Sequence, residues 1–115
     1  MNDLADLLSV VYELGIWPED PRSEAGRARF KSALRIFRKV LEHEWVKNLL
    51  NKRQKIRIIE ICGGTGIGGV GLAKVIQEKG LDIELYITDL REDALRIAES
   101  WGSEELNINI KTITL

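Results

Sequence analysis

The chain has 115 residues, of which 44% are hydrophobic and 30% are charged, as in one soluble globular domain rather than a disordered segment. Its single cysteine excludes an internal disulfide, and no apolar run reaches the roughly 18 residues that a membrane span needs. We therefore expect a cytoplasmic protein without a membrane segment. The abundance of Lys, Glu, Arg and Ile resembles the usage of thermophile proteins.

The formal net charge of −1 conceals an uneven distribution. Residues 1–21 carry five acidic and no basic side chains. Residues 22–57 carry twelve Lys or Arg and three Glu, a net charge of +9. A basic segment of this kind favours a negatively charged partner.

Two helices are predicted before the first strand. Asp3 caps a helix over residues 4–14, because leucines and a valine recur there at helical spacing. Two prolines make residues 16–21 a connector, with Trp17 as an anchor. Apolar side chains every three or four residues then predict one long helix over residues 23–50.

From residue 55 onward the pattern predicts strands and helices in alternation. The expected order is strand 55–61, helix 68–79, strand 83–88, helix 91–101 and strand 108–113. This order predicts an α/β fold, a partial Rossmann-like parallel sheet (β-α-β-α-β) preceded by two N-terminal helices. Residues 1–54 then form a helical segment and residues 55–115 the β-α-β-α-β unit.

A glycine cluster directly follows the first predicted strand and opens a helix. Gly64, Gly66 and Gly69 satisfy a G-x-G-x-x-G pattern, and Asp89 lies 23 residues beyond Gly66, at the end of the second strand. Glycines let the backbone turn sharply beside a ligand, and an acid at that strand end can accept hydrogen bonds from both hydroxyls of a ribose. The alternative is that Asp89 only caps the helix that follows.

The run Glu60-Ile61-Cys62-Gly63-Gly64-Thr65-Gly66 resembles motif I of the class I S-adenosylmethionine-dependent methyltransferases, and residues 86–95 look like the second-strand segment of that family. The resemblance covers residues 55–113 and implies the N-terminal, cofactor-binding half of a methyltransferase with S-adenosylmethionine as cofactor. The residues that it implies at the cofactor are Glu60, Cys62, Gly63, Gly64, Thr65, Gly66, Gly68, Asp89 and Leu90.

The resemblance also implies a role for several of these residues. Gly64 and Gly66 would line the methionine part of the cofactor, with Glu60 supporting the loop. Asp89 would hold the ribose, and Leu90 would pack on the adenine.

Cys62 departs from the family pattern, because it stands where the first glycine is usual. No His partner lies nearby in the sequence, so we expect a small buried residue rather than an activated thiol. His43, between two glutamates, is expected to be a solvated helix residue, and no metal site is expected.

Two other function classes remain open. A dinucleotide-binding Rossmann module would share the glycine loop and Asp89 but would have no use for Glu60. A non-catalytic nucleic-acid-binding domain would instead depend on one basic helix face, formed by Arg27, Arg35, Arg38 and Lys39. If these side chains contact phosphate rather than solvent, they weakly favour RNA or DNA as the methyl acceptor.

The chain ends at the third predicted strand, whereas the resemblance implies a larger sheet whose later loops bind the acceptor. We therefore expect the cofactor half alone, with catalytic residues outside this chain and no methyl transfer by the chain by itself. An open strand edge favours self-association or pairing with a missing C-terminal half.

Overall fold

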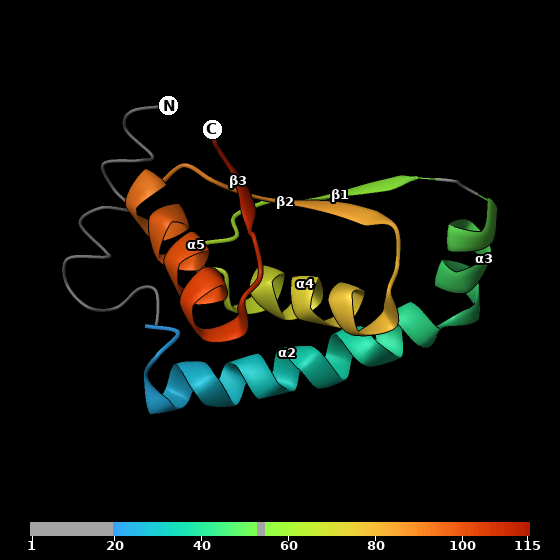
Figure 1. The fold of residues 1–115 in the computed structure, drawn as a ribbon, viewed down its shortest axis with the longest axis horizontal. Helices are drawn as coiled ribbons and strands as arrows, with labels where there is room; N and C mark the ends of the chain where they lie inside the picture. The colour runs from blue at the N-terminus through green and yellow to red at the C-terminus, as the bar shows by residue number, and fades with distance from the viewer. Residues whose placement is uncertain (1–19, 53–54) are drawn as a thin grey trace.

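The computed structural model describes residues 20–52 and 55–115 (Figure 1). The predicted helix over residues 4–14 and the predicted anchor Trp17 lie outside the described residues. The elements run in the order α2 (Glu24–Glu42), α3 (Glu44–Lys52), β1 (Ile56–Glu60), α4 (Ile67–Lys79), β2 (Ile83–Asp89), α5 (Glu92–Leu106) and β3 (Lys111–Thr114).

The three strands form one parallel sheet in the order β1-β2-β3. Glu60 is paired with Ile87 at the end of β1, and Asp89 is paired with Thr114 at the end of β2. Helices α4 and α5 connect the strands, which confirms the predicted α/β, partial Rossmann-like class. The carboxyl ends of all three strands meet at the same edge of the sheet, where such folds bind ligands.

The predicted helix over residues 23–50 is wrong as one element, because it is broken at His43 into α2 and α3. The backbone of His43 is extended, with φ −65° and ψ 137°. Its ring Nδ1 accepts a hydrogen bond from the Trp45 amide at 3.1 Å, in the manner of a helix N-cap. Apolar periodicity continues across the break, so spacing alone did not reveal it.

Helix α5 is longer than predicted. It continues through Gly102 to Leu106, and Asn107 in the left-handed conformation ends it. A Cβ on Gly102 would lie 2.6 Å from Cγ1 of Ile110, so the glycine provides room for the segment that leads to β3. A strand was predicted over residues 108–113, but because of this segment β3 begins only at Lys111. Helix α4 ends as predicted, at the left-handed Gly80.

The predicted helical segment and the sheet unit share their apolar core. Helix α4 lies between the sheet and α2, as Figure 1 shows. One cluster of buried residues surrounds Trp101 and Ile87, with Phe30 of α2 packed against it. A second surrounds Val75 and includes Leu41 of α2. The α2 helix is therefore part of the same folded unit as the glycine loop.

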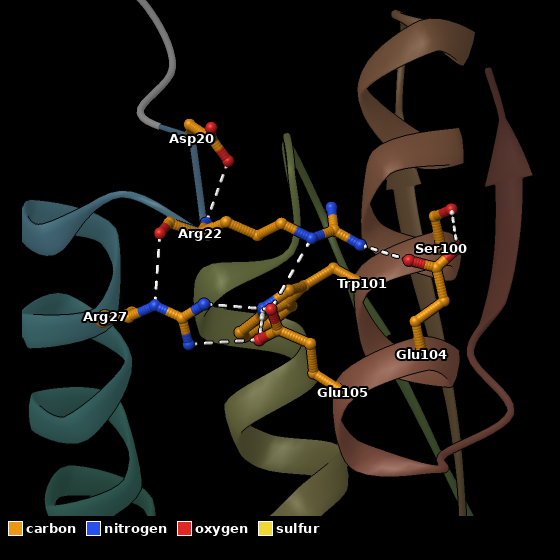
Figure 2. Close-up of polar contacts among 7 residues, drawn as sticks. All are labelled: Asp20, Arg22, Arg27, Ser100, Trp101, Glu104 and Glu105. Carbon is orange, nitrogen blue, oxygen red and sulfur yellow. Dashed lines mark hydrogen bonds and ion pairs between the residues drawn. The ribbon is translucent and has the colours of Figure 1, made fainter.

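Polar contacts join the start of α2 to the end of α5, as Figure 2 shows. Arg27 donates two hydrogen bonds to the Glu105 carboxylate, at 3.2 and 3.0 Å, and the Trp101 ring N–H donates to the same carboxylate at 2.7 Å. Arg22 pairs with Glu104 at 2.6 Å. These contacts lower the pKa of Glu105, chiefly through its bond with Arg27. The cluster fixes where α2 begins relative to α5.

In the described part of the chain, no helix is both long and apolar enough to cross a membrane.

Candidate functional site

The glycine loop joins β1 to α4 at the carboxyl edge of the sheet. Cys62, Gly64 and Gly66 have positive φ angles of 59°, 56° and 85°. The Gly66 amide donates to the Gly63 carbonyl at 3.0 Å, and Gly66 is the N-cap of α4, with no side chain capping the helix. The first amides of α4 are therefore not capped by a side chain, a typical arrangement beside a ligand.

The glycines of this loop serve two different purposes. A Cβ on Gly66 would lie 2.7 Å from Cβ of Ala98, and one on Gly63 or Gly69 would lie 2.6 Å from Oε1 of Glu60. These three glycines allow close packing inside the protein. Gly64 differs, because a Cβ there would meet nothing within 4 Å. Among the loop glycines, Gly64 therefore has open space beside its Cα.

A pair of glycine substitutions separates backbone strain from packing. Gly66→Ala places a Cβ both on a backbone with positive φ and against Ala98, whereas Gly80→Ala places a Cβ on a backbone with a φ of 62° and nothing within 4 Å. We expect Gly66→Ala to lower the free energy of unfolding by at least about 1 kcal/mol more than Gly80→Ala does. Urea denaturation measures both, and equal losses would contradict the close packing of Gly66.

Asp89 joins the second strand to the glycine loop. Its Oδ2 accepts a hydrogen bond from the Gly64 amide at 2.8 Å, and its Oδ1 accepts one from the Arg91 amide at 2.9 Å. The structure assigns the N-cap of α5 to Arg91, so Asp89 does not only cap that helix. A carboxylate accepts about four hydrogen bonds, which leaves acceptor capacity for ligand hydroxyls.

Glu60 lies beneath the loop, with its carboxylate against Gly63, Gly68 and Gly69. Its Oε1 is buried and has no hydrogen-bond partner among the residues that the structure describes. Burial, and secondarily the charge of Asp89, raises the pKa of Glu60 to about 7. An unpaired buried carboxyl beside a ligand loop is a costly feature, and such groups concentrate at functional sites.

Thr88 is a site residue that the sequence reasoning missed. It is 2% exposed, and its hydroxyl donates to the Glu60 carbonyl at 2.7 Å. Its own carbonyl accepts from the Gly63 amide at 2.8 Å. Thr88 thus ties the end of β1 and the loop to β2. In the sequence, the position of Thr88 directly before Asp89 was the feature that could have indicated this role.

The structure brings the predicted loop residues and Asp89 together, but it corrects the prediction for Cys62. Cys62 is exposed rather than buried, in a left-handed turn at the loop surface. Thr65 is buried, at 3% exposed, and Leu90 is half-buried directly after Asp89. The thiol therefore lies on the surface of the loop, where a glycine is usual in the family.

The predicted basic face is divided by ion pairs. Arg38 donates to the Glu78 carboxylate of α4 at 2.9 Å, and Arg27 is bound to Glu105. Arg35 donates to the Ser32 hydroxyl at 3.2 Å, and Lys39 is exposed. Two of the four cations thus neutralise acids of this chain, which weakens the case for a phosphate-binding face.

A hollow of about 240 Å³ lies elsewhere, between α4, β2 and the segment before β3. It is lined by Gly80, Ile83 and Lys111, which lie at the amino ends of β2 and β3. The hollow is therefore at the opposite edge of the sheet from the glycine loop. The polar groups that suit a nucleoside ligand are at the loop.

The residues of the loop fit the chemistry of S-adenosylmethionine. In a complex with it, Asp89 would supply carboxylate acceptors for the ribose hydroxyls, and Glu60 would supply a carboxyl for the positive charge of the ligand. Open space beside Gly64 admits a ligand next to the backbone.

Comparison with known proteins identifies a family for most of the chain. Residues 13–112 match the family described as lysine methyltransferase. No curated protein matches the chain.

Two solved structures align with the chain. The PH0226 protein of Pyrococcus horikoshii OT3 aligns with a TM-score of 0.53 and 18% identity, over 84% of this chain and 34% of that one. The plantazolicin methyltransferase BpumL, in complex with SAH, aligns with a TM-score of 0.46 and 23% identity, over 84% of this chain and 31% of that one. The chain thus spans about a third of the length of these two proteins. Because the family match extends over most of the sequence, the chain belongs to the lysine methyltransferase family, among the class I S-adenosylmethionine-dependent methyltransferases.

Proposed function

We propose that the glycine loop and Asp89 bind S-adenosylmethionine, and that the protein containing this domain transfers the cofactor's methyl group to the amine of a lysine. The hydrogen bond between Asp89 Oδ2 and the Gly64 amide carries the first part of the proposal. It joins the acid at the end of β2 to the one loop glycine that has open space beside it. The description of the family carries the second part.

Each residue of the site has a distinct task in this proposal. Asp89 accepts hydrogen bonds from the ribose hydroxyls and keeps the loop in place through Gly64. Leu90 provides an apolar contact for the adenine. The cofactor supplies a methyl group on a sulfonium, and the chain's contribution is to orient it for attack by a nucleophile.

Calorimetry with S-adenosylmethionine and with NAD tests the cofactor assignment. We expect heat of binding with S-adenosylmethionine and none with NAD, because Glu60 suits a cationic ligand and opposes a pyrophosphate. Binding of NAD alone would instead indicate the dinucleotide module that shares the glycine pattern. Binding of neither ligand would contradict the proposed function.

Lysine as acceptor replaces the nucleic acid that the charge distribution weakly favoured. The description of the family names lysine as the residue that is methylated. In addition, Arg27 and Arg38 are paired with acids of the same chain. We expect no retention of RNA or DNA by the chain in filter binding at about 50 mM salt, where phosphate contacts are strong. Salt-dependent retention would restore the nucleic-acid interpretation.

Two exposed isoleucines on one face of the sheet support the proposal that the chain associates with itself. Ile59 is paired with Tyr86, and Ile113 with Thr88 two residues further along β2, so both isoleucines point to the same face. They are 58% and 43% exposed, while buried residues of α4 and α5 pack against Ile87 on the other face. Light scattering should show a species larger than the monomer, and Ile59→Lys with Ile113→Lys should reduce it. A monodisperse wild-type monomer would contradict this prediction.

A further inference from the structure

Glu60 differs from the acidic side chains at the surface of this domain. Glu84, for example, contacts the hydroxyl of Tyr86 and the ammonium of Lys111, and its pKa is lowered to about 2. Glu60 instead has a buried oxygen to which no group in the described part of the chain donates a hydrogen bond. Glu60 and Glu84 are the same residue type on neighbouring strands, so the difference between their pKa values comes from their surroundings.

Among residues 20–52 and 55–115, no positively charged side chain is paired with Glu60. Gly68 and Gly69 face it from α4, and their Cα atoms leave room for the carboxylate. Ile87 is its neighbour on β2, and Asp89 is the charged side chain that acts on it from that strand. Burial beside another carboxylate opposes ionisation, because burial removes the anion from bulk solvent and the charge of Asp89 repels it.

We propose that Glu60 makes the loop selective for a positively charged ligand, holding a proton while the loop is empty and releasing it when the cation binds. The inference rests on the proposed function, because S-adenosylmethionine carries an ammonium and a sulfonium against one carboxylate. The O–H bond of the Glu60 carboxyl breaks, its electron pair stays on the carboxylate, and the proton goes to the buffer. No other reactant is needed.

Selectivity follows from the same exchange. Binding of a cationic ligand favours the ionised form of Glu60, which then attracts the ligand. An uncharged nucleoside leaves Glu60 neutral. Affinity for the cationic ligand therefore rises with pH until the free domain has lost the proton. Affinity for an uncharged ligand such as 5′-methylthioadenosine stays level over the same range.

The first experiment measures Glu60 in the free chain, without any ligand. Carbon-detected NMR of glutamate carboxyl groups, with Glu60→Gln to assign the signal, should give a midpoint near pH 7 for Glu60. A midpoint near the ordinary value of about 4.3 would overturn the inference, whatever the chain binds. This result is independent of the proposed cofactor.

The second experiment measures the proton that binding releases. Calorimetry at pH 7 in two buffers of different ionisation enthalpy should show release of roughly half a proton per S-adenosylmethionine bound, since about half of the free molecules hold it. With 5′-methylthioadenosine the release should vanish. It should vanish with Glu60→Gln as well, while Glu24→Gln, which removes one exposed carboxylate at the start of α2, keeps it.

The two experiments separate failure of this inference from failure of the proposed function. Binding of S-adenosylmethionine without proton release would overturn the inference and leave the cofactor assignment intact. A raised Glu60 midpoint without binding of S-adenosylmethionine would remove the cofactor assignment, and with it the ligand named in the inference. Equal release in the Glu60→Gln variant would show that another group exchanges the proton.

Discussion

Replacing Trp101 by alanine should lower the free energy of unfolding by about 3–5 kcal/mol, the usual loss for a large buried aromatic side chain. Trp101 is 1% exposed and lies in the core cluster of α5 and β2. Its ring meets that of Phe30 edge to face, with centroids 4.8 Å apart. Its ring N–H also donates to Glu105, which binds Arg27 of α2. The substitution thus removes packing and a polar link between α2 and α5 together.

Trp45 provides the matched control, because the chain has a second described tryptophan that is 68% exposed on α3. Trp45→Ala should change the free energy of unfolding by less than about 0.5 kcal/mol. Guanidinium denaturation followed by circular dichroism measures both variants. If Trp101→Ala does not fold, Trp101→Phe keeps the ring contact, loses the hydrogen bond and should cost about 1–2 kcal/mol. Equal losses for Trp101 and Trp45 would contradict the described core.

Replacing Asp89 by alanine should weaken binding of S-adenosylmethionine by about 1–3 kcal/mol, a roughly 5- to 150-fold higher Kd. The change removes the proposed acceptor of the ribose hydroxyls. It also removes the bond that places the Gly64 amide. Asp89→Asn keeps one acceptor oxygen and should lose less.

Asp93→Ala is the control for this prediction. Asp93 is also an acid near the start of α5, but it is exposed and pairs with Arg91 rather than with the loop. Calorimetry should give Asp93→Ala a Kd close to that of the wild type. The same Kd for wild type and Asp89→Ala would remove Asp89 from the site.

Much of the fold and of the site was predictable from local pattern. Isoleucine-rich segments that end at glycine or aspartate mark parallel strands, and the glycine spacing places a loop between strand and helix. The number of residues between Gly66 and Asp89 then predicts that the glycine loop and the end of the second strand meet in space. The bond between Gly64 and Asp89 agrees with that expectation.

The errors arose where long-range packing decides the local structure. The break at His43 depends on a ring nitrogen that caps the next helix, and apolar spacing does not register it. The extension of α5 through Gly102 depends on Ile110, which lies eight residues further along the chain. Cys62 is exposed because the loop turns it outward with a positive φ, which residue size alone does not predict.

Amide NMR of the ¹⁵N-labelled chain during titration with S-adenosylmethionine tests the central claim most directly. The claim predicts that the shifted amides are those of residues 60–69 and 89–91, which form the loop and the end of β2. Amides that line the hollow at the amino ends of the strands should not move. No shifts at all, or shifts confined to that hollow or to the arginines of α2, would contradict the assignment of the glycine loop and Asp89 as the cofactor site.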